Sequence, residues 1–360
     1  MRILHLSHNG LPDVRVERAA QTAKKDGYIT CFAGPFIKDT GFPIRSFHKF
    51  YELPFNKFAN AKIPSYWGTL KRRLSRILGE YRPDLIHAHN IVAAKLASEF
   101  SISFVYDDHE YWSKRFKAQA RIGKPNKMYI QWLWTRWEKE VLHKASATIT
   151  VSKSVAEEHK RLCKHVYIAP NFPSHIESES LEMKFKKDYL SSVYVGTDCS
   201  RPSSSPYRNV EGLLQIFRDN DVGKLTVLGD PTLCSSRNIK SLGFLPHQTM
   251  MQELTKHHIG LLPWKKHWFH KYSNPNKPYE YAHAGLLVLT VSDFPCVTRN
   301  LEENCIVFDN YQELRKLLLF YADNLDEINE LRVKIRKFAL GNLTWEKRCE
   351  SEILDAYSRT

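Results

Sequence analysis

The sequence predicts an α/β protein made of two doubly wound parallel-sheet domains of similar size. Short apolar runs rich in β-branched residues alternate with longer helical patterns along the whole chain, which is typical of parallel strands joined by helices. The alternation restarts after the segment PNFPSHIESES at positions 170–180, which we interpret as an interdomain linker. The length of 360 residues, with 42% hydrophobic and 26% charged residues, fits a globular protein and excludes disordered and fibrous classes.

The first half begins with a predicted strand and continues through alternating strands and helices. We expect its strands at Arg2–Leu6, Tyr28–Phe32, Leu85–His87, Phe104–Tyr106, Ala147–Val151 and Val166–Ile168. The amphipathic patterns between them predict helices near Arg15–Lys25, Tyr66–Tyr81, Asn126–His143 and Lys153–Leu162.

The second half repeats this organisation. Its predicted strands are Leu190–Val195, Lys224–Leu228, Asn238–Leu242, His258–Leu262, Leu286–Val291 and Ile306–Phe308. A final amphipathic helix is predicted over Asn342–Tyr357. Because parallel sheets of this kind bind ligands at the carboxyl ends of their strands, we searched for site residues just after each strand.

Charge is distributed unevenly between the two halves. Residues 1–170 contain 29 basic and 15 acidic residues, whereas residues 171–360 contain 24 of each, so the first half carries the whole excess of +14. This asymmetry predicts a polyanionic partner for the first domain, such as nucleic acid, an anionic membrane surface or a phosphate-bearing substrate. A solvated basic face without a partner is the alternative.

Cysteine usage and hydropathy indicate a cytosolic protein. The seven cysteines form no CxxC pair, so we expect neither a disulfide framework nor a cysteine-based zinc site. No apolar run approaches the ~18 residues of a membrane span. The opening MRILHLSH lacks the apolar core of a signal peptide, so we expect no secretion.

The segment Ser273–Gly285, SNPNKPYEYAHAG, is the most informative about function. It opens an apparent helix that Ser273 or Asn274 can cap, and the free N–H groups at such a helix start suit a phosphate. Lys277 adds a positive charge. Glu280, about one turn later, can accept two hydrogen bonds from a ribose diol. A surface helix with an incidental Lys–Glu pair is the alternative interpretation.

A second candidate is His109, which follows a predicted strand in the run DDHE at positions 107–110. This run could form a metal site with His87 and His89, but we expect ligands that alternate along a strand to point to opposite faces, which disfavours that site. Asp107 and Asp108 could instead mimic the aspartate pair of a metal-dependent transferase. A structural histidine is the remaining alternative.

Eight segments resemble, in the right order, those of glycosyltransferase family 4, the retaining GT-B enzymes. The run SNPNKPYEYAHAGLLVLTVSDFP resembles the family's donor-binding motif, as an SNPNK-x-x-E-Y variant of the E-x7-E pattern. LPDVRVERAAQTAKKDGY, RPDLIHAHN, FVYDDHEYWS and ATITVSKSVAEEH resemble segments of the first domain. SVYVGTD, TVLGDP and IKSLGFLPHQTMMQEL resemble segments of the second.

The resemblance implies a GT-B fold, in which two Rossmann-like domains face a central cleft. Residues 1–169 would form the acceptor-side domain, residues 170–341 would bind the nucleotide sugar, and residues 342–360 would cross back to the first domain. A UDP- or GDP-linked sugar would be the co-substrate, with no metal and no other cofactor.

The resemblance also implies roles for individual residues. His109 and Glu280 would be catalytic, with His109 facing the donor sugar and Glu280 holding the ribose. We assign Ser273 to the place of the first motif glutamate, which normally contacts the sugar hydroxyls, and expect altered sugar specificity rather than inactivation. Arg208 and Lys277 would neutralise the leaving diphosphate. The full donor-binding set is Gly196, Arg208, Ser273, Asn274, Asn276, Lys277 and Glu280.

The acceptor side is expected in the first domain. Gly10, Asp13 and Arg15 would face the cleft from the loop His8–Val14 and the helix after it. Arg15 and Arg18 lie three residues apart, on nearly one helix face, and could hold an anionic acceptor. Alternatively, Arg18 pairs with a neighbour on its own helix.

Basic residues beside aromatic ones predict contact with an anionic membrane surface. These clusters are KRR at 71–73 with Arg76, KRFK at 114–117 and WLWTRW at 132–137. The alternative for the three tryptophans of the last cluster is packing under the sheet.

The leading hypothesis is a retaining, metal-independent glycosyltransferase that acts at the cytoplasmic membrane face on a lipid-linked or cell-surface glycan. The donor's own phosphate oxygen would help to deprotonate the acceptor. The alternatives are a nucleotide-sugar epimerase or hydrolase of the same fold, a degenerate transferase acting as a partner subunit, and a nucleic-acid-binding protein. The neutral second half and the lack of a recognisable nucleic-acid module disfavour the last, so we expect no nucleic-acid partner.

Overall fold

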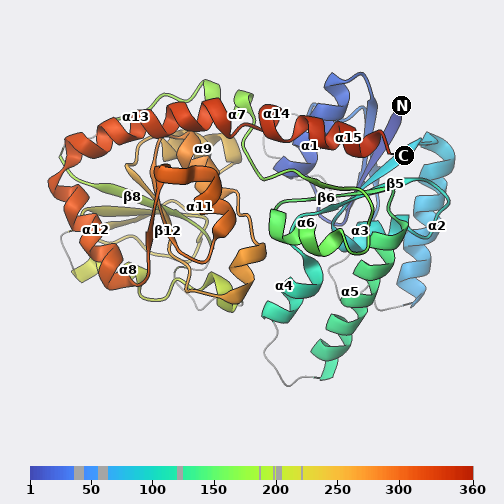
Figure 1. Cartoon of the computed structure of the whole chain (residues 1–360), viewed down its shortest axis with the longest axis horizontal. Helices are drawn as coiled ribbons and strands as arrows, with labels where there is room; N and C mark the ends of the chain where they lie inside the picture. The colour runs from blue at the N-terminus through green and yellow to red at the C-terminus, as the bar shows by residue number, and fades with distance from the viewer. Residues whose placement is uncertain are drawn as a thin grey trace. The chain divides into compact units, whose positions relative to one another are not determined.

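The computed structural model describes residues 1–35, 44–55, 64–119, 125–185, 188–197, 199, 205–219 and 222–359. It divides into two compact units (Figure 1). Unit 1 comprises Met1–Pro170 with Cys349–Thr360, and unit 2 comprises Asn171–Arg348. Each unit contains one parallel sheet flanked by helices, which confirms the predicted α/β fold with two doubly wound sheets.

Unit 1 has a seven-stranded sheet in the order β3-β2-β1-β4-β5-β6-β7. Its strands are β1 (Arg2–Ser7), β2 (Ile29–Gly34), β3 (Lys49–Glu52), β4 (Leu85–His89), β5 (Phe104–Asp108), β6 (Ala147–Thr150) and β7 (Val166–Ile168). The sequence did not predict β3, because this largely exposed edge strand, KFYE, has no apolar run. The strand order reverses between β1 and β4, so ligands of such a sheet bind beyond the carboxyl ends of these strands.

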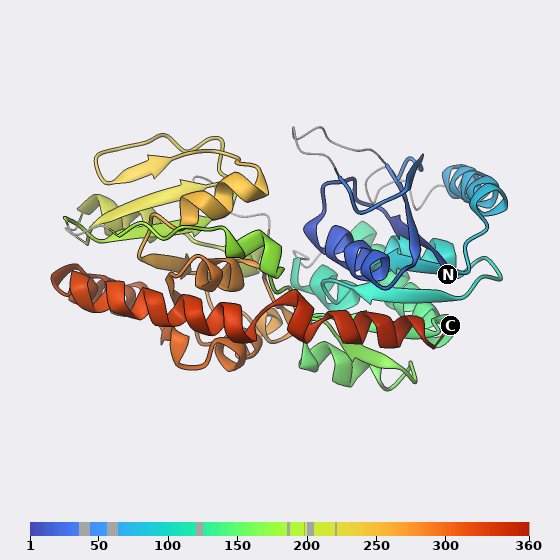
Figure 2. The ribbon, with the colours of Figure 1, turned by 90° about the horizontal axis from the view of Figure 1, so that it is seen from above.

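Helices cover the sheet of unit 1, and the last helix of the chain is one of them. They are α1 (Val14–Lys25), α2 (Pro64–Tyr81), α3 (Asn90–Ala97), α4 (Trp112–Gln119), α5 (Pro125–Lys144), α6 (Lys153–His159) and α15 (Glu350–Tyr357). Helix α15 packs on α1, β6 and β7, and Figure 2 shows it alongside α1. The single helix predicted over Asn342–Tyr357 is wrong, because the chain leaves helical geometry at Leu343 and again at the buried Cys349.

Unit 2 has a six-stranded sheet in the order β10-β9-β8-β11-β12-β13, which reverses between β8 and β11. Its strands are β8 (Ser191–Val195), β9 (Lys224–Leu228), β10 (Ile239–Ser241), β11 (Ile259–Leu262), β12 (Leu287–Val291) and β13 (Cys305–Phe308). The α-helices are α7 (His175–Glu179), α8 (Leu213–Asp219), α9 (His247–Leu254), α10 (Lys277–His283), α11 (Pro295–Leu301), α12 (Tyr311–Asp323), α13 (Leu325–Asn342) and α14 (Trp345–Arg348). Three 3₁₀ helices complete it, η2 (Pro206–Arg208), η3 (Trp268–Tyr272) and η4 (Glu302–Asn304).

The segment that we interpreted as a linker is ordered by local hydrogen bonds. Ser174 and Glu177 form a capping box at the start of α7, in which the Glu177 carboxylate accepts hydrogen bonds from the Ser174 N–H and hydroxyl. This arrangement holds Glu177 in place near the functional residues of unit 2 described below.

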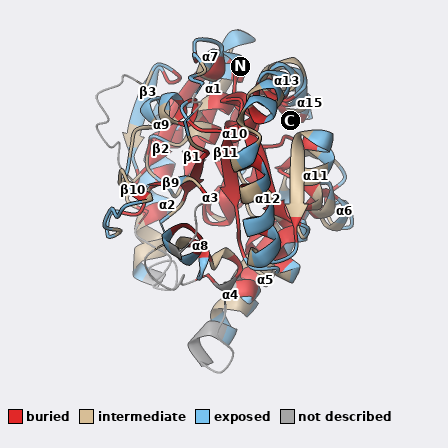
Figure 3. Ribbon diagram, turned by 90° about the vertical axis from the view of Figure 1, so that its left-hand side faces the viewer, coloured by how far each residue is buried: buried red, intermediate tan, exposed pale blue. Residues whose placement is uncertain are grey.

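The central strands of both sheets are buried, while the outer faces of the helices are exposed (Figure 3). The three tryptophans of α5 divide between these environments. Trp134 and Trp137 pack in the core of unit 1, whereas Trp132 is 53% exposed. Packing is therefore the correct interpretation for two of the three. Among the described residues, no helix is both long and apolar enough to cross a membrane.

Candidate functional site

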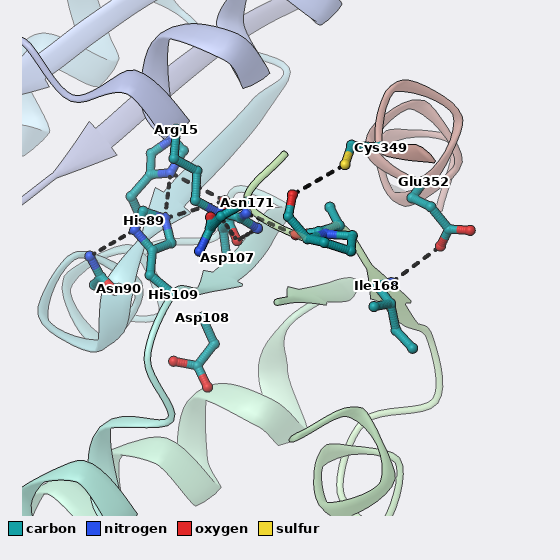
Figure 4. Close-up of polar contacts among 12 residues, drawn as sticks. Arg15, His89, Asn90, Asp107, Asp108, His109, Ile168, Asn171, Cys349 and Glu352 are labelled. Atoms are coloured by element: carbon teal, nitrogen blue, oxygen red, sulfur yellow. Dashed lines mark hydrogen bonds and ion pairs between the residues drawn. The ribbon is translucent and has the colours of Figure 1, made fainter. Parts of the chain in front are cut away.

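Asp107 and Asp108 end β5 and leave opposite faces of the sheet, because successive residues of a strand alternate in direction. Asp107 faces Arg15 of α1, and Asp108 faces His159 of α6. Figure 4 shows Asp107 beside Arg15 and His89, with Asp108 pointing away from them. Both aspartates are fully buried, so each needs partners that stabilise its charge.

Arg15 supplies that stabilisation for Asp107. The Arg15 Nη2 donates to Asp107 Oδ1 at 2.7 Å and Nε donates to Oδ2 at 3.1 Å, while Nη1 donates to the Ala169 carbonyl at 2.8 Å. Burial alone would raise the pKa of Asp107, but the positive charge of Arg15, together with the contacts of His109 and His87, outweighs burial and holds the pKa well below its usual value. Arg15 is only 5% exposed and its guanidinium is bound by Asp107 and the Ala169 carbonyl, so an acceptor contact for Arg15 stays a prediction.

Three imidazoles surround the other oxygen of Asp107. Its Oδ2 lies 3.4 Å from His87 Nε2, 3.5 Å from His89 Nδ1 and 3.3 Å from His109 Nε2. His87 and His89 stack with 4.2 Å between ring centroids, so our expectation that they point to opposite faces is wrong. Residues two apart on a strand share a face. His5 of β1 extends the group, with Nδ1 3.1 Å from His89 Nε2. We call Arg15, His5, His87, His89, Asp107 and His109 the Asp107 cluster.

This cluster contains two candidate metal-ligand sets among the described residues. The ligand atoms of His5, His87 and His89, and those of His89, Asp107 and His109, lie within 4.8 Å of one another. Burial lowers the pKa of His5, His87 and His89, so these rings are neutral. Neutral imidazole is the form that binds a metal, and it is also the form that makes directional hydrogen bonds.

His109 lies at the carboxyl end of β5, where sequence reasoning expected a catalytic residue. It is 12% exposed, the most accessible of the imidazoles around Asp107. Its Nδ1 lies 3.3 Å from the Asn90 Nδ2, and the Asn90 Oδ1 accepts a 2.8 Å hydrogen bond from the Trp112 indole N–H. Sequence reasoning did not identify Asn90 or Trp112, because nothing local indicates that Asn90 contacts His109 or that Trp112 contacts Asn90.

Asp108 belongs to a second buried group. The His159 Nε2 donates to Asp108 Oδ2 at 2.7 Å, and the nearby Glu138 accepts a hydrogen bond from the Ser113 hydroxyl. Burial and then the charge of Asp108 raise the pKa of Glu138 to about 7. Burial lowers the pKa of His159, but the hydrogen bond and charge of Asp108 outweigh it and the net direction is upward.

These shifts make the stability of the protein depend on pH. Between pH 4.5 and about 7 the folded state keeps a proton on Glu138 that the unfolded chain has lost. His159 contributes its full stabilisation of the folded state below pH 6.5, its ordinary pKa. This stabilisation is lost as the pH rises through the higher pKa that His159 has in the folded protein. The free energy of unfolding should therefore fall with rising pH, by up to about 1.4 kcal/mol per pH unit for Glu138.

Urea titrations at several pH values test this expectation in wild type and in Glu138→Gln. The variant should flatten the fall between pH 5 and 7, since glutamine cannot titrate. Glu157→Gln, at an exposed position on α6, is the control and should keep the wild-type slope. An unchanged slope in Glu138→Gln would show that another group carries the dependence.

In unit 2, Glu280 lies on α10 and is 4% exposed. Its Oε1 accepts a hydrogen bond from the His247 Nε2 at 3.1 Å, and the Nδ1 of His247 lies 3.7 Å from Glu177 Oε1. Sequence reasoning missed His247, although it lies in the segment IKSLGFLPHQTMMQEL, which resembles a segment of the family's second domain. Only the fold shows that the start of α9 meets α10.

Lys277 lies within electrostatic reach of both Arg208 and Glu280. Burial lowers the pKa of Lys277, the positive charge of Arg208 lowers it further, and the negative charge of Glu280 opposes both. The Arg208 guanidinium lies 5.4 Å from the Trp264 ring centroid and 5.6 Å from that of Tyr207. The structure therefore brings together the three charged residues predicted for donor binding.

The other residues of the SNPNK run have different environments. Asn274 is buried, and its Oδ1 accepts a 2.5 Å hydrogen bond from the Tyr279 hydroxyl. Helix α10 begins at Lys277 with Asn276 as N-cap and no side-chain capping bond, so the predicted capping by Ser273 or Asn274 is wrong. Ser273 is the C-cap of η3 and is partly exposed, as is Asn276. Asn274 fixes the shape of this turn from inside.

The position of the first motif glutamate also needs correction. An E-x7-E pattern separates its glutamates by eight positions, so counting back from Glu280 reaches Tyr272 rather than Ser273. Tyr272 is buried at the end of η3. Neither residue has a carboxylate, so the expectation about sugar specificity applies to both positions.

The remaining predicted residues lie at the ends of first strands. Gly196 follows β8, and a Cβ there would collide with the ring and hydroxyl of Tyr194, so any other residue would require the Tyr194 ring to move. In unit 1, Asp13 is the N-cap of α1, and its Oδ1 accepts the N–H of Arg15 at 3.2 Å and of Val16 at 3.3 Å. Gly10 is partly exposed in the loop before it. An acceptor contact for Gly10 or Asp13 stays a prediction.

Two family models match the chain. Residues 16–172 match the model described as Glycosyltransferase Family 4, and residues 208–354 match the model described as Glycosyl transferase-like. No sequence among curated proteins matches.

Solved structures with similar folds cover almost the entire chain. Sucrose-phosphate synthase from Thermosynechococcus elongatus is 12% identical, with a TM-score of 0.75 over 99% of this chain and 98% of that one. Anabaena HepE in complex with UDP is 12% identical, with a TM-score of 0.64 over 100% of both chains. An alpha-glucosyltransferase in complex with UDP-glucose and DNA containing an abasic site is 12% identical, with a TM-score of 0.63 over 99% of both. At this identity the likeness concerns the fold.

Proposed function

We propose that this chain, a glycosyltransferase with the GT-B fold, is a retaining enzyme that needs no metal. Its donor is a UDP- or GDP-linked sugar, and its acceptor is a lipid-linked or cell-surface glycan. The complexes of similar structures with UDP and UDP-glucose support the choice of donor class.

One observation carries the proposal, namely that Arg208, Lys277 and Glu280 come together in unit 2. Two cations suit a diphosphate, and a buried carboxylate suits the two hydroxyls of a ribose. A diphosphate and a ribose are both parts of a nucleotide diphosphate, and Lys277 and Glu280 lie within one turn of α10. Gly196 lets the chain after β8 approach a ligand closely, because it carries no side chain.

The reaction breaks the bond between the anomeric carbon and the donor phosphate and forms a bond from that carbon to the acceptor oxygen. Negative charge grows on the diphosphate as it leaves, and Arg208 and Lys277 stabilise it without moving. The acceptor proton passes to the departing phosphate oxygen on the same face of the sugar, which gives retention. His109 contributes from unit 1 as the residue that contacts the donor sugar.

A lipid-linked acceptor lies in a membrane, so the proposal includes contact of the protein with a membrane surface. Met128, Tyr129 and Trp132 of α5 are exposed, and the Arg136 guanidinium lies 5.5 Å from the Trp132 ring centroid. Exposed aromatic and basic side chains on one helix suit a membrane interface. Co-sedimentation with vesicles of neutral and of anionic phospholipid measures this contact, and equal binding to both would contradict it.

A donor and acceptor panel tests the function. The full chain is titrated calorimetrically with UDP, GDP and their sugars, and products are then analysed with polyprenyl-linked, oligosaccharide and DNA acceptors, with and without EDTA. We expect one nucleotide class to bind and an EDTA-resistant product whose anomeric configuration matches that of the donor. A product without acceptor would indicate an epimerase or hydrolase, and glycosylated DNA would replace the proposed acceptor.

His247 should strengthen nucleotide binding, because it donates a hydrogen bond to the Glu280 carboxylate, which we assign to ribose binding. His247→Ala should weaken UDP or GDP binding by about tenfold, the effect of losing one hydrogen bond to a charged group. His247→Gln retains an N–H donor and should stay within about threefold of wild type. Equal affinities for wild type and His247→Ala would contradict this role.

A further inference from the structure

The hydrogen-bond partners of Asn90 determine which way its amide points. The Trp112 indole nitrogen carries a hydrogen and has no acceptor, so the Asn90 atom 2.8 Å from it must be the oxygen. The amide nitrogen of Asn90 then faces the His109 Nδ1 at 3.3 Å. This assignment follows from the chemistry of tryptophan alone, because the reversed amide would place two donors against each other.

The orientation of Asn90 in turn determines the protonation of His109. Since Asn90 donates to Nδ1, that nitrogen must hold a lone pair, and the single ring proton lies on Nε2. Nε2 is 3.3 Å from Asp107 Oδ2, which accepts the proton's hydrogen bond. His109 is thus held between a donor on one side and a carboxylate on the other, as a neutral Nε2–H tautomer.

The next contact of His109 is compatible with this assignment. The His109 Nε2 also lies 3.3 Å from the His89 Nδ1, so a proton on His109 Nε2 requires a lone pair on His89 Nδ1. The proton of a neutral His89 then lies on Nε2, which donates to the His5 Nδ1 at 3.1 Å.

The backbone conformation at Asn90 also indicates that its side chain has a functional role. Its φ of 68° is in the left-handed region, which costs energy for most residues and is tolerated by asparagine and glycine. Strained positions of this kind often aim a side chain at a functional group. Here the side chain joins Trp112 of α4 to His109 after β5.

We propose that Asn90 and Trp112 are positioning residues that fix His109 as the neutral Nε2–H tautomer. The significance for catalysis rests on the proposed function, in which His109 contacts the donor sugar. A ring held in this way does not accept the acceptor's proton, so it acts as an oriented dipole beside the reacting sugar rather than as a general base. This agrees with the assignment of the base to the departing phosphate.

Imidazole ¹⁵N NMR of protein labelled only at histidine tests the tautomer directly and needs no substrate. The chain has 16 histidines, and His109 is assigned by its absence from His109→Gln. Wild type should show His109 protonated at Nε2 only. Trp112→Phe, which removes the indole N–H, should release Asn90 and give a mixture of tautomers. Asn90→Asp should add a proton at Nδ1, because an acceptor then faces it.

Asn90→Gly is the matched backbone variant, because glycine adopts the same φ without strain and removes only the amide. It should also give mixed tautomers, and kcat should fall about tenfold, the effect of one hydrogen bond, with KM for the donor within threefold. Circular dichroism and the thermal midpoint verify that each variant folds. A kcat equal to wild type in Asn90→Gly would overturn the positioning role.

A wild-type signal with His109 protonated at Nδ1, or a mixture of tautomers, would overturn the assignment. So would a metal site: if one equivalent of Zn²⁺ shifts the signals of His5, His87 and His89 and raises the thermal midpoint, these rings bind a metal rather than form the hydrogen-bond network. Failure of the proposed function is a separate result. It would appear as no activity with any donor while the tautomer remains as assigned.

Discussion

Replacing Glu280 by alanine should weaken UDP or GDP binding by about 10²-fold, because two hydrogen bonds from the ribose to a charged, buried acceptor are lost. Glu280 is 4% exposed, so the carboxylate is already largely withdrawn from water before a nucleotide binds. Because the carboxylate is preorganised in this way, its removal should lower the affinity for the nucleotide strongly. Isothermal titration with the nucleotide diphosphate measures the effect, and kcat/KM for the donor should fall at least as much.

Two further variants separate recognition from folding. Glu280→Gln preserves the shape and should lose about tenfold, since a neutral amide oxygen is a weaker acceptor than a carboxylate. Glu182→Gln is the control, because that side chain is 83% exposed and should leave binding unchanged. If Glu280→Ala binds the nucleotide as wild type does, the assignment of unit 2 as the donor-binding unit fails.

Replacing Arg15 by methionine should destabilise the protein by about 3–5 kcal/mol, the usual cost of leaving a buried charge without its partner. The charge left behind is that of Asp107, which is fully buried, and the neutral imidazoles around it do not replace the guanidinium. Urea unfolding followed by tryptophan fluorescence measures the loss.

The double variant Arg15→Met, Asp107→Asn shows whether the cost arises from the ion pair. With both charges removed, we expect most of the lost stability to return, because no uncompensated charge remains. Asp107→Asn alone should resemble Arg15→Met. If Arg15→Met is within about 1 kcal/mol of wild type, Asp107 is not held as a buried anion.

Glu280, Lys277 and Arg208 show how far the sequence leads in this protein. All three were assigned from short segments that resemble a known family, and the structure places Lys277 within electrostatic reach of both Arg208 and Glu280. The proximity of Lys277 to Glu280 was predictable because their spacing is set within one helix, whereas their role in donor binding stays a prediction. The helix start itself was misplaced, because the Asn274 side chain turns inward to Tyr279, and that contact has no local signal.

His247, Asn90 and Trp112 show where sequence reasoning stopped. Each acts through a residue distant in sequence: His247 is 33 positions from Glu280, and Asn90 is 19 from His109. Spacing identifies partners only within one helix or strand, so these pairs were out of reach. His87 and His89 are different, since the period of two along a strand was available and was misapplied.

The order of strands and helices, and therefore the two doubly wound sheets, was determined by the sequence itself, because apolar periodicity is a local property that each segment carries alone. Only the tertiary structure determined which charged groups pair. Arg15 is the buried partner of Asp107 although 92 positions separate them, and the adjacent Asp108 lies on the opposite face of the sheet, where its partner is His159. The physical reason is that burying a carboxylate requires a counter-charge or donors nearby, and only the folded chain brings them there.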